Sequence, residues 1–170
     1  MTGPPEKSEA AAYYFRYIDR VPPGDIVDTL ESQLGSVTAL FSGISEERSL
    51  HRYAADKWSV RQLANHVADT ERLFAFRALW FSRGFQDPLP SFEQDPAVAA
   101  AKADAVAWAR HVEEFRAVRQ ATVAFFRNLP AEAWDRRGVA SGNPVTVRAL
   151  AYIAAGHADH HASILRERYL

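Results

Sequence analysis

The sequence contains no cysteine among its 170 residues. This absence excludes disulfide bonds, thiolate metal ligands and a cysteine nucleophile together. A metal ion must therefore be bound by histidine, aspartate or glutamate side chains. Any thiol that takes part in a reaction has to come from outside the chain.

Long apolar runs and an excess of charge are also absent. No apolar stretch approaches the ~20 residues that a membrane-spanning helix requires, and the N-terminal residues lack the basic and apolar regions of a signal peptide. The formal net charge is only −1, with no basic stripe, which argues against binding to nucleic acids or membranes. The hydrophobic content of 48% suits one globular domain with its own core. We therefore predict a cytoplasmic protein with a small-molecule substrate.

Hydrophobic residues recur at helical spacing in four long segments, and no segment shows the alternation of a β-strand. The predicted helices begin near four residues: Asp25, Ser59, Ala97 and Thr146. Ser59 and Gln62 have the spacing of a capping box. The pattern predicts an all-α fold, an antiparallel four-helix bundle.

The segments outside the first two predicted helices differ in composition. Residues 1–24 contain a dense aromatic cluster and are predicted to form an arm or short helix packed on the bundle domain, residues 25–170. The segment 83–96 contains three prolines, so we expect a long ordered loop between helices 2 and 3. After it, the helical pattern runs without a break over residues 97–129.

The last predicted helix carries three of the six histidines, His157, His160 and His161. The apolar stripe places His157 and His161 on the inner face, one turn apart, and it places His66 on the inner face of the second helix. Neutral imidazole is a ligand for zinc, nickel, copper and iron. We expect these two helices to be diagonal neighbours, with His66, His157 and His161 binding one metal ion that keeps open coordination positions.

Other interpretations of the histidines remain. His160 is an alternative to either neighbour, because residues three apart also share a helix face. A single inward histidine is more often a hydrogen-bonded core residue, so a bundle with buried histidines and no metal is the structural alternative. His51 and His111 lack a partner at ligand spacing and are predicted to be exposed.

Three acidic residues near the histidines could orient the imidazole rings through their N–H groups: Asp69, Asp159 and Glu167. Arg119 interrupts the stripe of the third helix at about the depth of the histidines. It could bind an anionic group of a cofactor above the metal, or form a buried ion pair with Glu71. Trp58 is expected to shape the mouth of the pocket.

Several segments of the chain resemble the DinB-like (YfiT-like) metalloenzymes. The likeness is carried by residues 57–77, 88–95, 137–144 and 156–165, and it runs from about Tyr13 to the C-terminus. It implies a four-helix bundle with one divalent metal ion, often nickel or zinc, bound by the residues that match the family's histidines: His66, His157 and His161. It also implies a homodimer. Some members of this family are S-transferases that use bacillithiol, mycothiol or glutathione.

These observations suggest a metal-dependent transferase that joins a low-molecular-weight thiol to an electrophile. The metal would bind the thiol and stabilise its thiolate, which is the nucleophilic form. A first alternative is hydrolysis or isomerisation by metal-activated water, with Asp69 as general base. A second is a stress protein that binds a metal or small ligand without catalysis.

Overall fold

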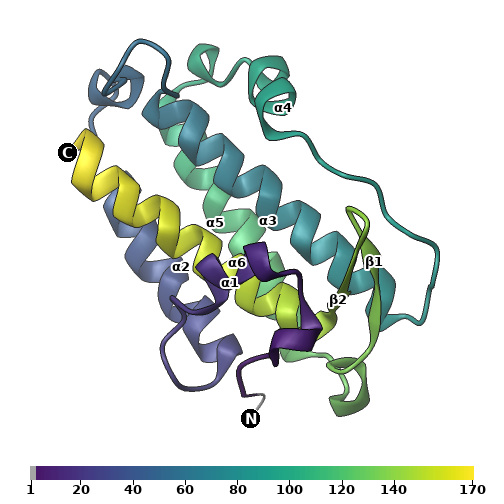
Figure 1. The fold of residues 1–170 in the computed structure, drawn as a ribbon. Coiled ribbons are helices and arrows are strands. Elements are labelled where there is room, and N and C mark those ends of the chain that lie inside the picture. The colour runs from purple at the N-terminus through teal and green to yellow at the C-terminus, as the bar shows by residue number, and fades with distance from the viewer. Residues whose placement is uncertain (1–2) are drawn as a thin grey trace.

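The computed structural model describes residues 3–170. Its core is a four-helix bundle (Figure 1), as predicted, formed by α2 (Ile26–Ser42), α3 (Val60–Ser82), α5 (Trp108–Arg127) and α6 (Val147–Ile164). The last helix continues as a π-helical turn, Leu165–Tyr169. None of the described helices combines the length and the apolarity that crossing a membrane requires.

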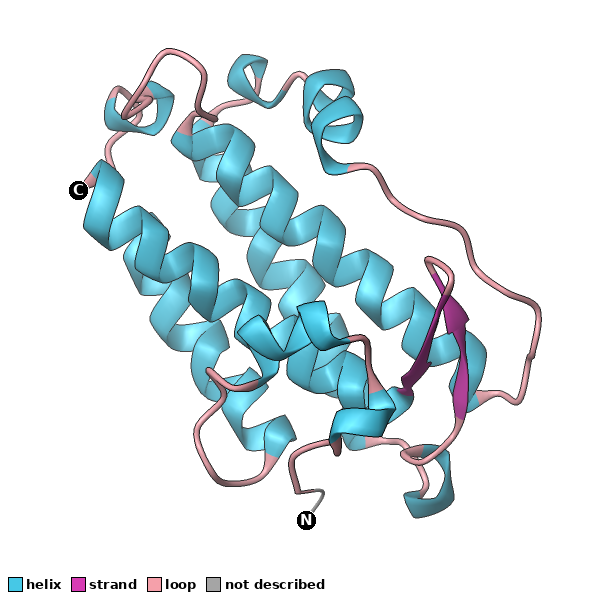
Figure 2. Ribbon diagram, viewed as in Figure 1, coloured by secondary structure: helices cyan, strands magenta, loops and turns pink. Residues whose placement is uncertain are grey.

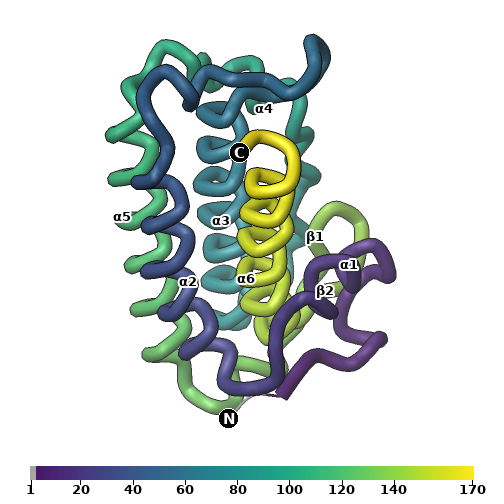
Figure 3. Tube along the Cα trace, turned by 90° about the vertical axis from the view of Figure 1, so that its left-hand side faces the viewer, coloured from purple at the N-terminus to yellow at the C-terminus, as the bar shows by residue number. Residues whose placement is uncertain are grey.

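The order of the helices around the bundle differs from the predicted one. Helix α3 packs against α5 and α6, and α2 packs against the same two helices. The prediction that α3 and α6 are diagonal is therefore wrong, because they are direct neighbours. Figures 1 and 3 show the cause: the long connection after α3 returns the chain to the end where α3 began, so α3 and α5 run in the same direction. Antiparallel packing then places the start of α3 beside the end of α6.

Polar side chains cap three of the bundle helices where the sequence predicts. Asp25 Oδ1 accepts a hydrogen bond from the Val27 amide at 2.8 Å. Ser59 and Gln62 form the predicted capping box at the start of α3. The Thr146 hydroxyl oxygen accepts from a backbone amide three residues later. Each cap satisfies an amide group that has no partner inside its own helix.

The third predicted helix is divided in the structure. A short helix, α4 (Gln94–Ala101), ends at Lys102, which has a left-handed backbone with φ 52°, and α5 begins only at Trp108. The connection packs on the start of α3, where Asp104 accepts hydrogen bonds from Arg52 and Ser59. These contacts replace the continuous helix that the hydrophobic period predicted over residues 97–129.

A small β-hairpin follows α5, which corrects the expectation of no strands (Figure 2). Strands β1 (Arg137–Ala140) and β2 (Asn143–Thr146) pair antiparallel around Ser141 and Gly142, whose φ angles are 53° and 74°. Two positive φ angles are typical of a tight hairpin turn. The Leu89 backbone forms hydrogen bonds with Val139 in β1 and with Ser141 in the turn. Strands of four residues are too short for alternation to show in the sequence.

The N-terminal segment packs across α6. It contains two 3-10 turns, Lys7–Glu9 and Ala12–Tyr14, followed by α1 (Phe15–Ile18), and the first two residues of the predicted arm lie outside the described range. A Cβ atom on Gly156 would lie 2.0 Å from the backbone oxygen of Tyr17. Only glycine therefore allows α1 to approach α6 this closely, one residue before His157.

Candidate metal centre

Three histidine side chains meet between α3 and α6. The Nε2 atom of His157 lies 3.2 Å from His66 Nε2 and 3.1 Å from His161 Nε2. One nitrogen from each ring lies within 4.8 Å of the other two. Two imidazoles bound to one ion at ~2.1 Å place their nitrogens about 3.0–3.4 Å apart for bond angles between octahedral and tetrahedral. The cluster therefore has the dimensions of a three-histidine metal site.

Burial keeps these histidines neutral. It lowers the pKa of His66 to about 4, against a small opposing effect of Asp95, and it lowers the pKa of His161 to about 3. The pKa of His157 lies well below its ordinary value because of burial and the neighbouring imidazoles. Neutral imidazole is the metal-binding form. Nitrogen atoms gathered at this spacing can thus hold one divalent cation.

Thr70 determines which nitrogen of His157 carries the proton. Its hydroxyl donates to the His66 carbonyl oxygen at 2.7 Å, and its oxygen lies 3.3 Å from His157 Nδ1. Because the single hydroxyl proton is used, the Thr70 oxygen accepts a hydrogen bond from His157 Nδ1–H. The lone pair on Nε2 then points into the cluster. Such a contact fixes both the tautomer and the orientation of a ligand.

The three acidic residues predicted to orient the imidazole rings do not contact the ring nitrogens. Asp69 accepts a hydrogen bond from Arg72 at 3.1 Å, and Asp159 accepts one from Arg20 at 2.8 Å. Glu167 is exposed on the C-terminal turn. Burial raises the pKa of Asp69, partly offset by Arg72, but none of the three carboxylates bonds to a ring nitrogen of the cluster. The prediction of an acidic shell around the histidines is therefore wrong.

The remaining histidines lie outside the cluster. The His160 ring packs against Tyr17, with centroids 5.4 Å apart, and is partly exposed. His111, predicted to be exposed, is buried, and its Nε2 lies 3.0 Å from the Ala103 carbonyl oxygen. The rearranged connection before α5 covers it, which the assumption of a continuous helix concealed. His51 is partly exposed in the turn before α3.

Arg119 is completely buried and forms an ion pair with Glu71, with N–O distances of 2.7 and 2.8 Å. Its Nη1 donates to Gln33 Oε1 and to a backbone carbonyl oxygen. All three guanidinium nitrogens are therefore used inside the core. This arrangement corrects the anion-binding interpretation of Arg119 and agrees with the buried ion pair.

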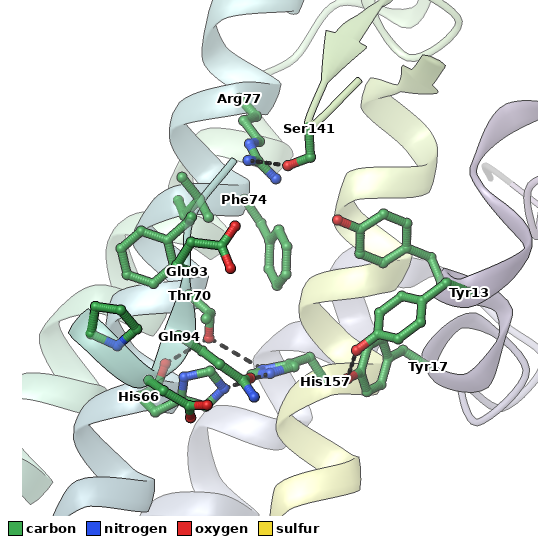
Figure 4. A pocket seen from close by; sticks show the side chains of 15 residues that line it. Tyr13, Tyr17, His66, Thr70, Phe74, Arg77, Glu93, Gln94, Ser141 and His157 are labelled. Carbon is green, nitrogen blue, oxygen red and sulfur yellow. Dashed lines mark hydrogen bonds between the residues drawn. The ribbon is translucent and has the colours of Figure 1, made fainter. Parts of the chain in front are cut away.

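Two cavities flank the histidine cluster. The first, of about 370 Å³, is lined by His66 and His157 at one end and by Arg77 (Figure 4). The second, of about 340 Å³, is lined by Trp58 and His161. The Trp58 ring also packs on His66, with centroids 4.8 Å apart, in agreement with a place at the pocket mouth.

The first turn of α4 lies between the two cavities. Gln94 and Asp95 line both of them, and the charge of Asp95 acts on the His66 ring. Sequence reasoning missed these residues and Thr70. Proline is common in the first turn of a helix. Pro96 therefore indicated that a helix begins near Gln94, whereas the sequence analysis took it as part of a loop.

Comparison with known proteins identifies the family of this chain. The family model described as the DinB superfamily matches residues 29–165. The chain belongs to the DinB superfamily. No curated protein matches the sequence.

Two solved structures share the fold of this DinB superfamily member. One is YfiT from Bacillus subtilis, described as a probable metal-dependent hydrolase with an unusual four-helix bundle topology. It has 14% identity and a TM-score of 0.70, over 96% of this chain and 89% of that chain. The other is the DinB-like protein YjoA from Bacillus subtilis, with 23% identity and a TM-score of 0.60, over 84% of this chain and 87% of that chain.

The depressed histidine pKa values predict that the metal-free protein loses stability as the pH falls. The unfolded chain binds a proton to each histidine near pH 6.5, whereas folded His66 binds one only near pH 4. The unfolded state therefore holds more protons between these values, and acid favours unfolding. Each such histidine contributes a slope of about 1.4 kcal/mol per pH unit. Denaturant unfolding at pH 7.5, 6 and 5 measures the slope.

A variant separates this effect from the titration of carboxylates, which has the same sign. His66→Asn removes one titrating group, so the slope between pH 6 and 5 is expected to decrease by about 1 kcal/mol per pH unit. An unchanged slope would show that His66 does not resist protonation in the folded state.

Proposed function

We propose that this protein is a divalent-metal-dependent enzyme that transfers an external low-molecular-weight thiol to a small electrophile. The observation that supports this proposal is the pair of cavities that meet at the histidine cluster. A transfer between two organic molecules needs two binding spaces beside one reactive centre, whereas hydrolysis needs only one. The chain has no cysteine that would compete for the metal or the electrophile.

The residues of the site have separate tasks in this proposal. His66, His157 and His161 hold the metal, and Thr70 orients His157 through its Nδ1–H. When bound, the metal lowers the pKa of the incoming thiol and so supplies a thiolate near neutral pH. Zinc and nickel are the proposed metals, since imidazole binds both.

The rings of Tyr17 and Trp58 pack against two different histidines of the cluster. The Tyr17 ring packs edge-on against His157, with centroids 5.2 Å apart, and Trp58 packs on His66. Burial, followed by the contact with Tyr13, raises the pKa of Tyr17 to about 12. Its hydroxyl is therefore neutral and can donate a hydrogen bond to a developing negative charge.

The test combines the purified protein, reloaded with zinc or nickel, with bacillithiol, mycothiol or glutathione and a chromogenic electrophile. The expected result is turnover with at least one thiol and none with the His66→Ala variant. The His160→Ala variant is the control, because His160 lies on the same helix but outside the cluster. Equal rates for the wild type and His66→Ala with every thiol would contradict the proposal.

A second candidate is hydrolysis by metal-activated water, favoured by the position of Asp95 over the cluster. This carboxylate lies close enough to act on the charge of His66 and could accept a proton from water. The role first considered for Asp69 is not supported, because that side chain bonds to Arg72. Asp95→Asn should abolish hydrolysis of an ester substrate but leave thiol transfer active. If neither assay gives product and the protein still binds the metal tightly, the result would favour a protein that binds a metal or small ligand without catalysis.

The proposed homodimer remains a prediction from the family resemblance. Light scattering of the purified protein measures the mass directly. A mass of one chain would contradict it.

A further inference from the structure

Arg77 is a buried cation that has no acidic partner among residues 3–170. The described residues include three buried arginines: Arg61, Arg77 and Arg119. Arg61 forms an ion pair with Glu46, and Arg119 forms one with Glu71. Arg77 has no described carboxylate within the 4.0 Å of an ion pair. Burying a charge costs free energy unless an opposite charge compensates it. Binding of an anion beside this guanidinium would supply that compensation.

The described contacts of Arg77 are with neutral groups. Its Nη2 donates to the Pro90 carbonyl oxygen at 2.8 Å and to Ser141 Oγ at 2.9 Å. Its Nε is buried without a hydrogen-bond partner among the described residues. These contacts attach the loop after α3 and the β-hairpin to the guanidinium and fix its position. They leave its charge uncompensated and part of its donor capacity unused.

The position of Arg77 connects it to the metal centre. It lines the same cavity as His66 and His157, and Figure 4 shows it at the opposite end, with Phe74 between. Arg77 lies eleven positions after His66 on α3, which is about 16 Å along the axis. Helical side chains lean toward the N-terminus, so the long arginine reaches back toward the histidines. The guanidinium and the cluster are then roughly 10–15 Å apart.

We propose that Arg77 binds the carboxylate of an elongated small molecule whose other end reaches the histidine cluster. The walls between the two ends include the rings of Phe74, Tyr13 and Tyr17, against which a carbon chain can pack. Both N–H groups of Arg77 Nη2 are already used, so the N–H groups of Nη1, which have no described partner, are the ones that can donate to a carboxylate in a charge-assisted contact. The claim that the other end of the molecule reaches the histidine cluster rests on the proposed function. The claim that Arg77 binds a carboxylate does not.

Glu93 and Asp95 are the acidic side chains that line this cavity. Asp95 acts on the His66 ring at the other end, so Glu93 is the one that could compete for this role. It lines the same cavity, but it is exposed and forms no ion pair with Arg77. Water therefore screens its charge, and it does not replace a carboxylate that enters the buried end of the cavity.

The first experiment measures carboxylate binding without any thiol. NMR titrations of the protein with hexanoate and with 1-hexanol compare ligands of equal chain length that differ in charge. The wild type should bind hexanoate about tenfold or more tightly than hexanol, as expected for a charge-assisted hydrogen bond. Arg77→Gln should weaken the binding of hexanoate by a similar factor and leave the affinity for hexanol unchanged. Arg77→Lys, which keeps the charge, should retain part of the preference.

Two results would overturn the proposal. One is equal affinity of the wild type for hexanoate and hexanol, which needs no variant and so does not depend on whether Arg77→Gln folds. The other is an undiminished preference for hexanoate in folded Arg77→Gln, which would place the carboxylate elsewhere.

A second experiment measures the distance between the two ends. The cobalt-substituted protein is titrated with 3-mercaptopropionate, 6-mercaptohexanoate, 8-mercaptooctanoate and 11-mercaptoundecanoate, and thiolate binding is followed by visible absorption. Affinity relative to the matching mercaptoalcohol should rise about tenfold once the chain spans the cavity, and this rise should disappear in Arg77→Gln. A ratio that is the same for all lengths would contradict the bridging geometry. Absence of a thiolate band with every thiol would count against thiol transfer, while the hexanoate titration still decides the role of Arg77.

Discussion

Replacing His66 by alanine is expected to lower the affinity for zinc or nickel by ~100-fold or more and to abolish turnover. One third of the ligand set is lost, and it is the only part that α3 provides, since His157 and His161 both belong to α6. Loss of even a group that orients a ligand reduces metal affinity by about 10–100-fold, so loss of a ligand should have at least this effect. Competition with a chromophoric chelator measures the affinity, and elemental analysis measures the metal content.

The matched control for this change is His160→Ala. His160 has the same chemistry and lies next to His161 in the chain, but its ring packs edge-on against Tyr17 and His161 and does not contribute a nitrogen to the cluster. The variant should keep one equivalent of metal and nearly the affinity of the wild type. Equal losses in the two variants would mean that the ion is not bound by the cluster of His66, His157 and His161.

The sequence was informative about the histidines because their positions follow from helix geometry alone. His157 and His161 are four residues apart on an amphipathic helix, and His66 falls on the apolar stripe of another. These facts do not depend on how the helices are connected. The wrong assumption that α3 and α6 are diagonal did not matter, because inner faces meet in the core in either arrangement.

The surroundings of the cluster could not be predicted in the same way. Asp69 and Asp159 are close to the histidines in the chain, yet Asp69 bonds to Arg72 on its own helix and Asp159 bonds to Arg20 of the N-terminal segment. Thr70 orients His157 only because the pairing of α3 with α6 brings the two side chains together. Asp95 reaches the cluster through the return of the chain after α3. Such long-range contacts leave no periodic signal in one sequence.

Replacing Arg119 by methionine is expected to destabilise the fold by about 3–5 kcal/mol. The change leaves the Glu71 carboxylate buried without its partner, and a buried unpaired charge costs far more than a surface ion pair contributes. Glu71→Leu should have a similar cost for the opposite reason, because it leaves the guanidinium unpaired. Equilibrium denaturation in urea, with the slope checked for two-state behaviour, gives both values.

The surface pair Arg127–Glu31 is the control. It joins the same helix, α5, to α2 at a comparable 2.7 Å, but both side chains are about half exposed. Solvent screening leaves such an exposed pair with little net effect, so Arg127→Ala should change the stability little. Comparable losses from Arg127→Ala and Arg119→Met would show that burial does not determine the cost.

The double variant Arg119→Met/Glu71→Leu tests what the buried pair is for. Removing both charges should restore much of the lost stability, because apolar replacements of buried ion pairs are often neutral or better. The pair nevertheless belongs to a polar layer across the bundle: Arg119 also binds Gln33 of α2, whose side-chain amide donates to the Ala155 carbonyl oxygen of α6 at 3.0 Å. Since that oxygen lies two residues before His157, the layer holds α6 in register with the other three helices. A double variant that is stable but binds metal about tenfold more weakly would show that the buried charges maintain the geometry of the histidines, whereas full metal affinity would limit their role to stability.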